Sequence, residues 1–261
     1  MNPPNASVPV LEMRGVTAVA LREPDTVVAE AVDWTVAAGD YWVVGGLQGS
    51  GKSDFLQMAG GLTAPARGAY RFFGEPMPIF DEGRLAQRLR LAFVFEAGQP
   101  FSRLTLLENV ALPLCYHRNL SRSDAERQVW QLLELTGLEP WANSTPGAMP
   151  THWQRRAGLA RALMLKPEVL LLDNPLTGLD LRHRAWWLAF LSHLSQGHPW
   201  LDHHPLTLVA TADDLFPWRR HARQFAVLRD RRWTVLGSWD KVESSAEENV
   251  QELLALSPSG G

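Results

Sequence analysis

The sequence has one cysteine and no long apolar run. The lone Cys115 excludes an internal disulfide framework and any metal site built from several cysteines. We expect a reduced, half-buried thiol that packs as a small hydrophobic side chain. No apolar stretch approaches the roughly 18 residues that a membrane-spanning helix requires. The sequence therefore predicts neither a disulfide-stabilised scaffold nor an integral membrane protein.

A large excess of charge of one sign and a targeting segment are also missing. The 25 basic and 28 acidic residues leave a net charge of −3. Because nucleic-acid-binding domains are usually strongly basic, we expect no nucleic-acid partner. The segment Met1–Ser7 has neither a charged region nor an apolar one, so no signal peptide is predicted. The protein is expected to be cytosolic and soluble.

What is present is a globular composition, with 46% hydrophobic residues in a chain of 261. The segments Val8–Leu21 and Val27–Val36 are rich in valine and alanine and predict two strands with a connecting turn. A continuous apolar run predicts a buried strand at Tyr41–Val44, and further strands are predicted at Val169–Leu172, Thr207–Ala210, Phe225–Leu228 and Trp233–Leu236. Strands alternating with helices indicate an α/β core.

A helical insertion interrupts this core between about residues 100 and 151. Ser123–Glu126 is a capping-box sequence that predicts the start of a helix. Gly137 stands where a helix C-cap glycine is expected.

A phosphate-binding loop is the strongest chemical signal. The stretch Gly46–Ser53 fits the pattern G-x-x-x-x-G-K-[ST], follows a predicted strand and precedes a predicted helix. Its glycines allow backbone N–H groups to converge on phosphate oxygens at a helix N-terminus. Lys52 is expected to reach the β- and γ-phosphates, and Ser53 to bind Mg²⁺. The candidate nucleotide-binding residues are Gly46, Leu47, Gln48, Gly49, Ser50, Gly51, Lys52, Ser53 and Asp54.

Asp54 is an unusual neighbour for a phosphate. Two interpretations stay open from the sequence. Its carboxylate either repels the α-phosphate or stabilises the first turn of the helix, where negative charge is favourable.

A second half of the site lies further along the chain. Leu170–Asp173 is an apolar strand that ends in a carboxylate, as a Walker B aspartate does when it contributes to the Mg²⁺ shell. Together with Thr105–Pro113, Arg155–Ala162 and Thr177–Asp180, in this order and at this spacing, the chain resembles the ATP-binding cassette (ABC) family. The resemblance extends from about Met13 to Trp239.

The resemblance implies an α/β P-loop NTPase core with an antiparallel β subdomain and a helical subdomain. It implies one nucleotide-binding domain over 8–240, with the helical subdomain at about 100–155, and tails or a C-terminal helix at 1–7 and 241–261. It also implies ATP and Mg²⁺ as ligands, and a second cassette as dimer partner, identical or different. A membrane permease encoded separately would then hold the protein at the inner face of the membrane.

Several positions depart from the family pattern. The residues Met149–Trp153 stand in place of the signature Leu-Ser-Gly-Gly-Gln, and Pro150 there has no N–H to offer a phosphate. Asn174 stands in place of the catalytic glutamate, and Asp213 in place of the switch histidine. Glu96 stands in place of a glutamine, with Gln99 close enough for the alignment to slip. The segment Val16–Leu21 lacks the aromatic that stacks on adenine.

These departures predict that nucleotide binding is kept and that hydrolysis is lost or slow. Losing a general base typically costs 10²–10⁴-fold in rate. The alternative is an unconventional pair in which Asp213 is the base beside Asn174. At the level of function, the hypotheses are an ATP-binding transporter subunit and a pseudo-ATPase that supports an active cassette. A soluble ABC protein acting on ribosomes or DNA is disfavoured because those usually carry two cassettes.

Overall fold

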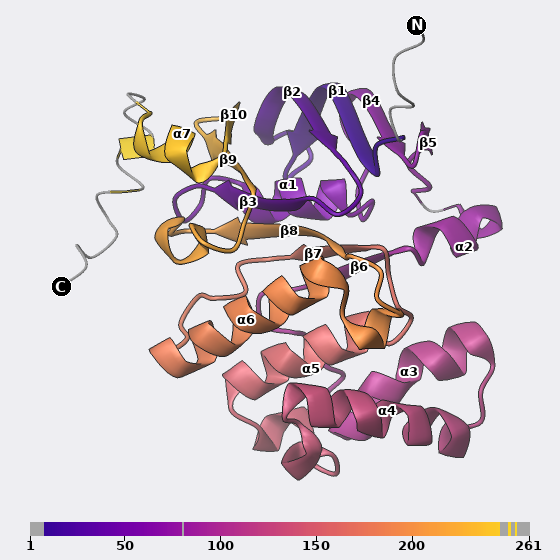
Figure 1. The fold of residues 1–261 in the computed structure, drawn as a ribbon. Helices are drawn as coiled ribbons and strands as arrows, with labels where there is room; N and C mark the ends of the chain where they lie inside the picture. The colour runs from indigo at the N-terminus through magenta and orange to yellow at the C-terminus, as the bar shows by residue number, and fades with distance from the viewer. Residues whose placement is uncertain (1–7, 80, 246–249, 252–253, 255–261) are drawn as a thin grey trace, which may run out of the picture.

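A ten-stranded sheet is the backbone of the fold, with strand order β5-β4-β1-β2-β10-β9-β3-β8-β7-β6. The computed structural model describes residues 8–79, 81–245, 250–251 and 254. Figure 1 shows helices α3–α6 below the central strands and the first strands of the chain above them. The predicted α/β class is confirmed by this arrangement. The predicted tail at 1–7 and much of the predicted C-terminal segment at 241–261 lie outside the described residues.

The centre of the sheet is parallel and completely buried. Strand β3 (Tyr41–Gly45) lies between β8 (Thr207–Ala212) and β9 (Gln224–Arg229), and β7 (Val169–Leu172) joins β8 to β6 (Leu91–Val94). All positions of β3, β7 and β8 are buried. Continuous apolar runs suit strands that are covered on both faces, which confirms the interpretation made from the sequence.

Antiparallel strands form the other half of the sheet. They are β1 (Leu11–Val19), β2 (Val27–Val36), β4 (Arg67–Phe72) and β5 (Glu75–Pro76). Strand β10 (Arg232–Gly237) pairs with β9 and touches β2, so it connects the two halves. Helix α1 (Lys52–Ala59) packs beneath them, with Phe55 at 5.8 Å from Trp34 between ring centroids. A separate apolar cluster fills this layer.

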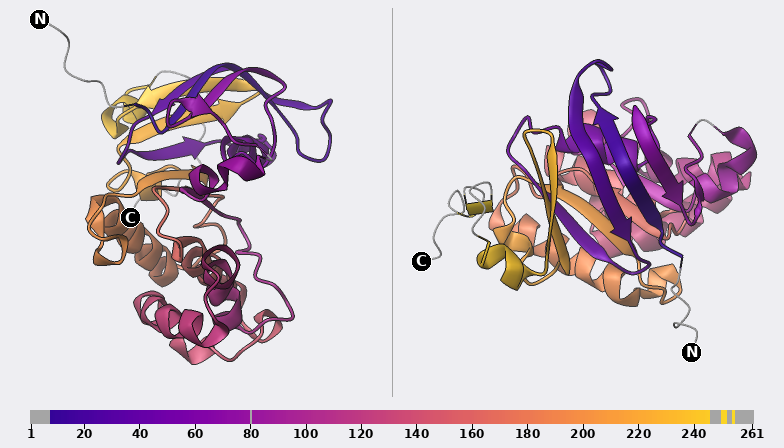
Figure 2. Two further views of the ribbon diagram at one scale, coloured as in Figure 1. Left: turned by 90° about the vertical axis from the view of Figure 1, so that its right-hand side faces the viewer. Right: turned by 90° about the horizontal axis from the view of Figure 1, so that it is seen from above.

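The helical insertion contains α3 (Leu106–Arg118), α4 (Arg122–Thr136) and α5 (Thr151–Leu163). In Figure 1 and in the left view of Figure 2, α3 and α4 lie at the end of the molecule opposite β1 and β2. Their buried leucines and valines belong to the same apolar cluster as β7 and β8. This continuity fixes the insertion to the core.

The ends of α4 correct one prediction and confirm another. Helix α4 has Ser121 as its N-cap, which accepts from the Asp124 backbone N–H, so the predicted cap at Ser123 is wrong by two residues. The structural reason is that Ser123 already lies inside the first turn. Gly137 caps the C-terminus with φ 66°, the left-handed conformation that glycine adopts without strain.

Three further helices and several short turns complete the described fold. Helix α6 (Leu181–Gly197) runs beside α5 in Figure 1, and α7 (Trp239–Glu243) follows β10. Helix α2 (Leu85–Arg88) precedes β6. Short 3₁₀ turns occur at Glu82–Arg84, Glu139–Trp141, Pro146–Ala148, Pro199–Leu201 and Phe216–Trp218.

The parallel register brings three strand ends to one edge. Gly45 at the end of β3 pairs with Ala212 at the end of β8, and Leu172 at the end of β7 pairs with Ala210. The segments that follow these strands therefore start side by side. They carry the residues singled out in the sequence.

Candidate functional site

The loop after β3 is built for close backbone approach. At Gly46, an added Cβ would lie 2.5 Å from the Leu228 carbonyl oxygen and 2.6 Å from Ser50 Oγ. At Gly51, with φ +88°, it would lie 2.6 Å from the Val28 Cβ. Only glycine fits at either position. At Gly49, with φ +80°, an added Cβ would meet nothing within 4 Å, so this side of the loop is open.

The remaining loop residues differ in exposure. Gln48 is exposed and Leu47 is half-buried. Ser50 Oγ is buried without a hydrogen-bond partner among the described residues. Because buried hydroxyls are normally bonded, this atom and the open side of the loop fit a ligand with oxygen acceptors, as a phosphate group has. The residues of the loop therefore fit a phosphate group.

Lys52 begins α1 and is buried, at 6% of its surface exposed. Its Nζ donates to the Gly46 carbonyl oxygen at 2.6 Å and to the Leu47 carbonyl oxygen at 2.8 Å. The third contact of Nζ is an ion pair of 3.0 Å with Asp213 Oδ1. The buried ammonium thus bonds the end of the loop to its beginning.

Ser53 and Asp173 meet although 120 residues separate them. Ser53 Oγ donates to Asp173 Oδ1 at 2.9 Å, and Thr211 Oγ1 donates to the same oxygen at 2.9 Å. Burial raises the pKa of Asp173, while these two hydrogen bonds and the charge of Lys52 oppose that rise. A hydroxyl and a carboxylate in contact with each other are hard oxygen ligands of the kind that Mg²⁺ accepts, with water or phosphate completing its shell.

Asn174 and Asp213 are also in direct contact. Asn174 Nδ2 donates to Asp213 Oδ2 at 2.8 Å, and the Asn174 backbone N–H donates to Thr211 Oγ1 at 2.8 Å. A continuous network thus joins the phosphate loop to the ends of β7 and β8. Asn174 has φ 42°, a left-handed conformation that asparagine tolerates better than most residues.

Asp54 has a role that neither interpretation from the sequence included. Its Oδ1 accepts from the Leu21 backbone N–H at 2.9 Å, 33 residues away. Asp54 does lie in the first turn of α1. Its carboxylate nevertheless also anchors the loop that follows β1. Sequence spacing gives no signal for such a long-range contact.

Glu96 follows β6 and is connected to the site by a residue that the sequence analysis did not single out. Arg155, on α5, donates through Nε to the Glu96 carbonyl oxygen. Its Nη1 donates to the carbonyl oxygens of Pro175 at 3.0 Å and Thr177 at 2.7 Å. Arg155 is 5% exposed and therefore crosslinks two site loops from within the core. Glu96 and Gln99 themselves are exposed.

Replacing Arg155 with alanine is expected to destabilise the fold by about 3 kcal/mol, because each buried carbonyl left without a donor costs about 1–3 kcal/mol. Urea denaturation would measure the change. Arg155→Lys should recover only part of the loss, since an ammonium lacks the fork geometry of a guanidinium. The control is Arg127→Ala on α4, whose side chain is 78% exposed and forms only an i,i+3 pair. A loss for Arg155→Ala no larger than for this control would contradict the crosslinking role.

The segment Met149–Trp153 contacts the start of α6 through the rings of His152 and Trp153. His152 and His183 have ring centroids 4.1 Å apart, and Asp180 Oδ1 accepts from the His183 backbone N–H at 2.8 Å. Burial and the neighbouring His183 lower the pKa of His152. His152 of this segment therefore lies beside Asp180 and His183 at the start of α6.

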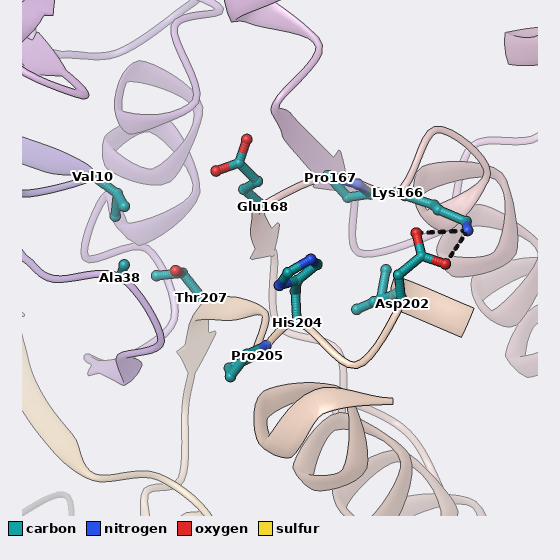
Figure 3. Close-up of a pocket in the computed structure, with 10 residues that line it drawn as sticks. Val10, Ala38, Lys166, Pro167, Glu168, Asp202, His204, Pro205 and Thr207 are labelled. Atoms are coloured by element: carbon teal, nitrogen blue, oxygen red, sulfur yellow. Dashed lines mark hydrogen bonds and ion pairs between the residues drawn. The ribbon is translucent and has the colours of Figure 1, made fainter. Parts of the chain in front are cut away.

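A cavity of about 420 Å³ lies elsewhere, at the opposite edge of the sheet (Figure 3). Its wall includes Thr207 at the start of β8 and Glu168, just before β7. Lys166 in this wall is already paired with Asp202 at 2.8 Å. The cavity shares no residue with the network around Lys52, and we assign it no part in the phosphate site.

Comparison with known proteins gives a consistent result. A family model described as "ABC transporter" matches residues 29–177. The intermembrane phospholipid transport ATP-binding protein MlaF of Escherichia coli K12 is 28% identical over 85% of this chain and 81% of its own length. The lipoprotein-releasing system ATP-binding protein LolD of Alcanivorax borkumensis is 33% identical over 74% of this chain and 85% of its own. The macrolide export ATP-binding/permease protein MacB of Azoarcus is 32% identical over 74% of this chain, which spans only 30% of that longer protein.

Solved structures agree. The dimeric ATP-binding cassette MJ0796 has a TM-score of 0.74 at 26% identity and covers 85% of this chain and 95% of its own. CbiO1 of Clostridium perfringens, part of the transporter complex cbiONQ, has a TM-score of 0.74 with 96% of both chains covered; at 20% identity it supports the fold alone. Within the described residues, no helix has the length and apolarity to cross a membrane.

Proposed function

Since this chain belongs to the ABC transporter family, we propose that it is the ATP-binding subunit of a transporter whose membrane-spanning part is a separate permease. MlaF and LolD, which match most of this chain, are named as ATP-binding proteins of transport systems. By analogy, the protein would lie at the inner face of the membrane, in the cytoplasm, attached through the permease. The cassette would span residues 8–240, with the helical subdomain near 100–155.

The observation that carries the proposal is the hydrogen-bond network between the phosphate loop and the ends of β7 and β8. The backbone of Gly46–Ser53 would hold the phosphates of ATP, and Lys52 would supply their positive partner. Ser53 and Asp173, already joined at 2.9 Å, would hold Mg²⁺. A bound Mg²⁺ supplies charge neutralisation for the phosphate chain. The residues of this chain bind and orient the nucleotide.

A weakly hydrolysing or inactive cassette is the second candidate, favoured by the contact between Asn174 and Asp213. The amide of Asn174 has no basic atom to accept a proton from water. Asp213, the alternative base, already accepts from Asn174 and pairs with Lys52. The protein would then serve as a regulatory or structural partner of an active cassette. We propose that binding is kept and that hydrolysis is slow.

The dimer expected of a cassette gives a direct test. The surface around Asp180 and Met149–Trp153 would meet a second cassette, because the corresponding segments of ABC proteins approach the nucleotide of the opposite subunit. Mg·ATP should therefore promote association in sedimentation velocity, with an identical chain or with a co-encoded cassette. The variant that tests this surface is His152→Ala. It removes the ring packed on His183 and should weaken association without removing nucleotide binding.

A protein that sediments as a monomer in every nucleotide state, alone and with the co-encoded cassette, would contradict the transporter assignment.

A further inference from the structure

The ammonium of Lys52 has a protein partner for each of its donors. A lysine ammonium has three N–H donors. Those of Lys52 face the carbonyl oxygens of Gly46 and Leu47 and the carboxylate of Asp213, at 2.6, 2.8 and 3.0 Å. The Lys52 side chain is 7% exposed and that of Asp213 is 41% exposed. The carboxylate thus lies between the buried ammonium and solvent.

Asp213 is held in this position from its other side. Its Oδ2 accepts from Asn174 Nδ2 at 2.8 Å, so the two oxygens have separate partners. Asn174 is itself fixed, because its backbone N–H donates to Thr211 Oγ1 at 2.8 Å. The carboxylate therefore has a defined orientation, with Oδ1 directed at Lys52. A freely rotating exposed aspartate would lack this constraint.

Two further carboxylates surround the loop. Asp54 is in the first turn of α1, and Asp173 is bonded to Ser53. Lys52 is ion-paired with Asp213, and its charge also acts on Asp173. An anionic ligand must therefore share Lys52 with Asp213 or displace Asp213 from it, and the electrostatic cost rises with the charge of the ligand. Neutral backbone N–H groups of the loop carry no such penalty.

We propose that Asp213 is a specificity-determining residue that biases the site toward nucleoside diphosphates over triphosphates, with Asn174 as its positioning residue. This inference rests on the proposed function of the same site. Asp213 occupies one donor of Lys52 and places a negative charge beside it. A terminal third phosphate adds negative charge and competes with Asp213 for that donor. A diphosphate carries less negative charge and is bound more by the backbone N–H groups of the loop.

The test is a competition assay in which ADP or ATP, each with excess Mg²⁺, displaces a fluorescent ADP analogue from the full-length protein. The measured quantity is the ratio of the ATP dissociation constant to the ADP dissociation constant. Asp213→Asn keeps the shape and an oxygen for Asn174 but removes the charge. We expect this ratio to fall by about tenfold, equivalent to about 1.4 kcal/mol. Asp213→His, a second variant without the carboxylate, should change the ratio in the same direction.

Two further variants separate the local ion pair from bulk charge and from a general structural effect. Asp214→Asn removes the neighbouring charge while keeping an oxygen for the Phe216 backbone N–H, and should leave the ratio within about twofold of wild type. Asn174→Ala should lower the ratio less than Asp213→Asn, because Asp213 remains but is no longer oriented. A merely structural role for Asn174 would weaken ADP and ATP binding equally and leave the ratio unchanged.

The outcomes distinguish this inference from the proposed function. An unchanged or increased ratio in Asp213→Asn and Asp213→His, with both nucleotides still bound, would overturn the inference and leave nucleotide binding intact. ADP binding by the wild type, with ATP binding that appears only when Asp213 is replaced, would support the inference and overturn ATP binding by the natural chain. Failure of every variant to bind either nucleotide would overturn both.

Discussion

Purified protein is expected to release phosphate from Mg·ATP at well below about 1 s⁻¹, the low end of ordinary enzyme turnover. The loss of a general base alone costs about 10²–10⁴-fold. Asn174 cannot accept the proton, and Asp213 is engaged by Lys52 and by Asn174. A steady-state phosphate-release assay measures this directly. Brisk turnover in the wild type that disappears in Asp213→Ala would instead identify Asp213 as the base.

Restoring the glutamate is expected to help little. Asn174→Glu should raise turnover by about tenfold or less, because residues that act as one catalytic unit are strongly non-additive. The structure adds a reason: a carboxylate at this position would face Asp213, with which Asn174 now shares a hydrogen bond of 2.8 Å. Like charges in contact repel and raise the pKa of one of the pair. The matched control is Asn174→Glu with Asp213→His, which removes the repulsion and should exceed either single variant.

A rate gain of more than about a hundredfold in Asn174→Glu alone would contradict this account, since it would restore much of what a general base supplies.

Local patterns in the sequence predict the strands and the phosphate loop because their causes are local. Tyr41–Val44 is apolar throughout, and in the structure it lies in β3, which is buried on both faces. A side chain at Gly46 would collide with Ser50 of the same loop, and one at Gly51 would collide with Val28. The apolar strand that ends in Asp173 likewise predicts a carboxylate for the Mg²⁺ shell, and Asp173 does bond to Ser53.

Contacts between distant segments could not be predicted in this way. Nothing near Asp54 in the sequence indicates its bond to the Leu21 backbone. Arg155 belongs to a family-like helix, yet its role depends on three carbonyls presented by other loops. The ion pair between Lys52 and Asp213 depends on the side-by-side ends of β3 and β8. Such interactions are set by tertiary packing and leave no periodic signal.

Lys52→Ala is expected to weaken Mg·ATP binding by at least about a hundredfold, or about 2.7 kcal/mol. Hydrogen bonds to charged groups contribute about 1.5–3 kcal/mol each, and the ammonium can make more than one. Its removal also leaves Asp213 beside the loop without its ion-pair partner. The control is Lys166→Ala, whose ammonium pairs with Asp202 at the opposite edge of the sheet and should leave binding unchanged.

Isothermal titration of Mg·ATP into wild type, Lys52→Ala and Lys166→Ala tests the central claim most directly. Saturable binding of one nucleotide per chain in the wild type and in Lys166→Ala, lost in a folded Lys52→Ala, is the predicted result. No binding to the wild type at millimolar nucleotide, or equal binding to Lys52→Ala, would contradict the assignment of the loop at Gly46–Ser53 as the nucleotide site.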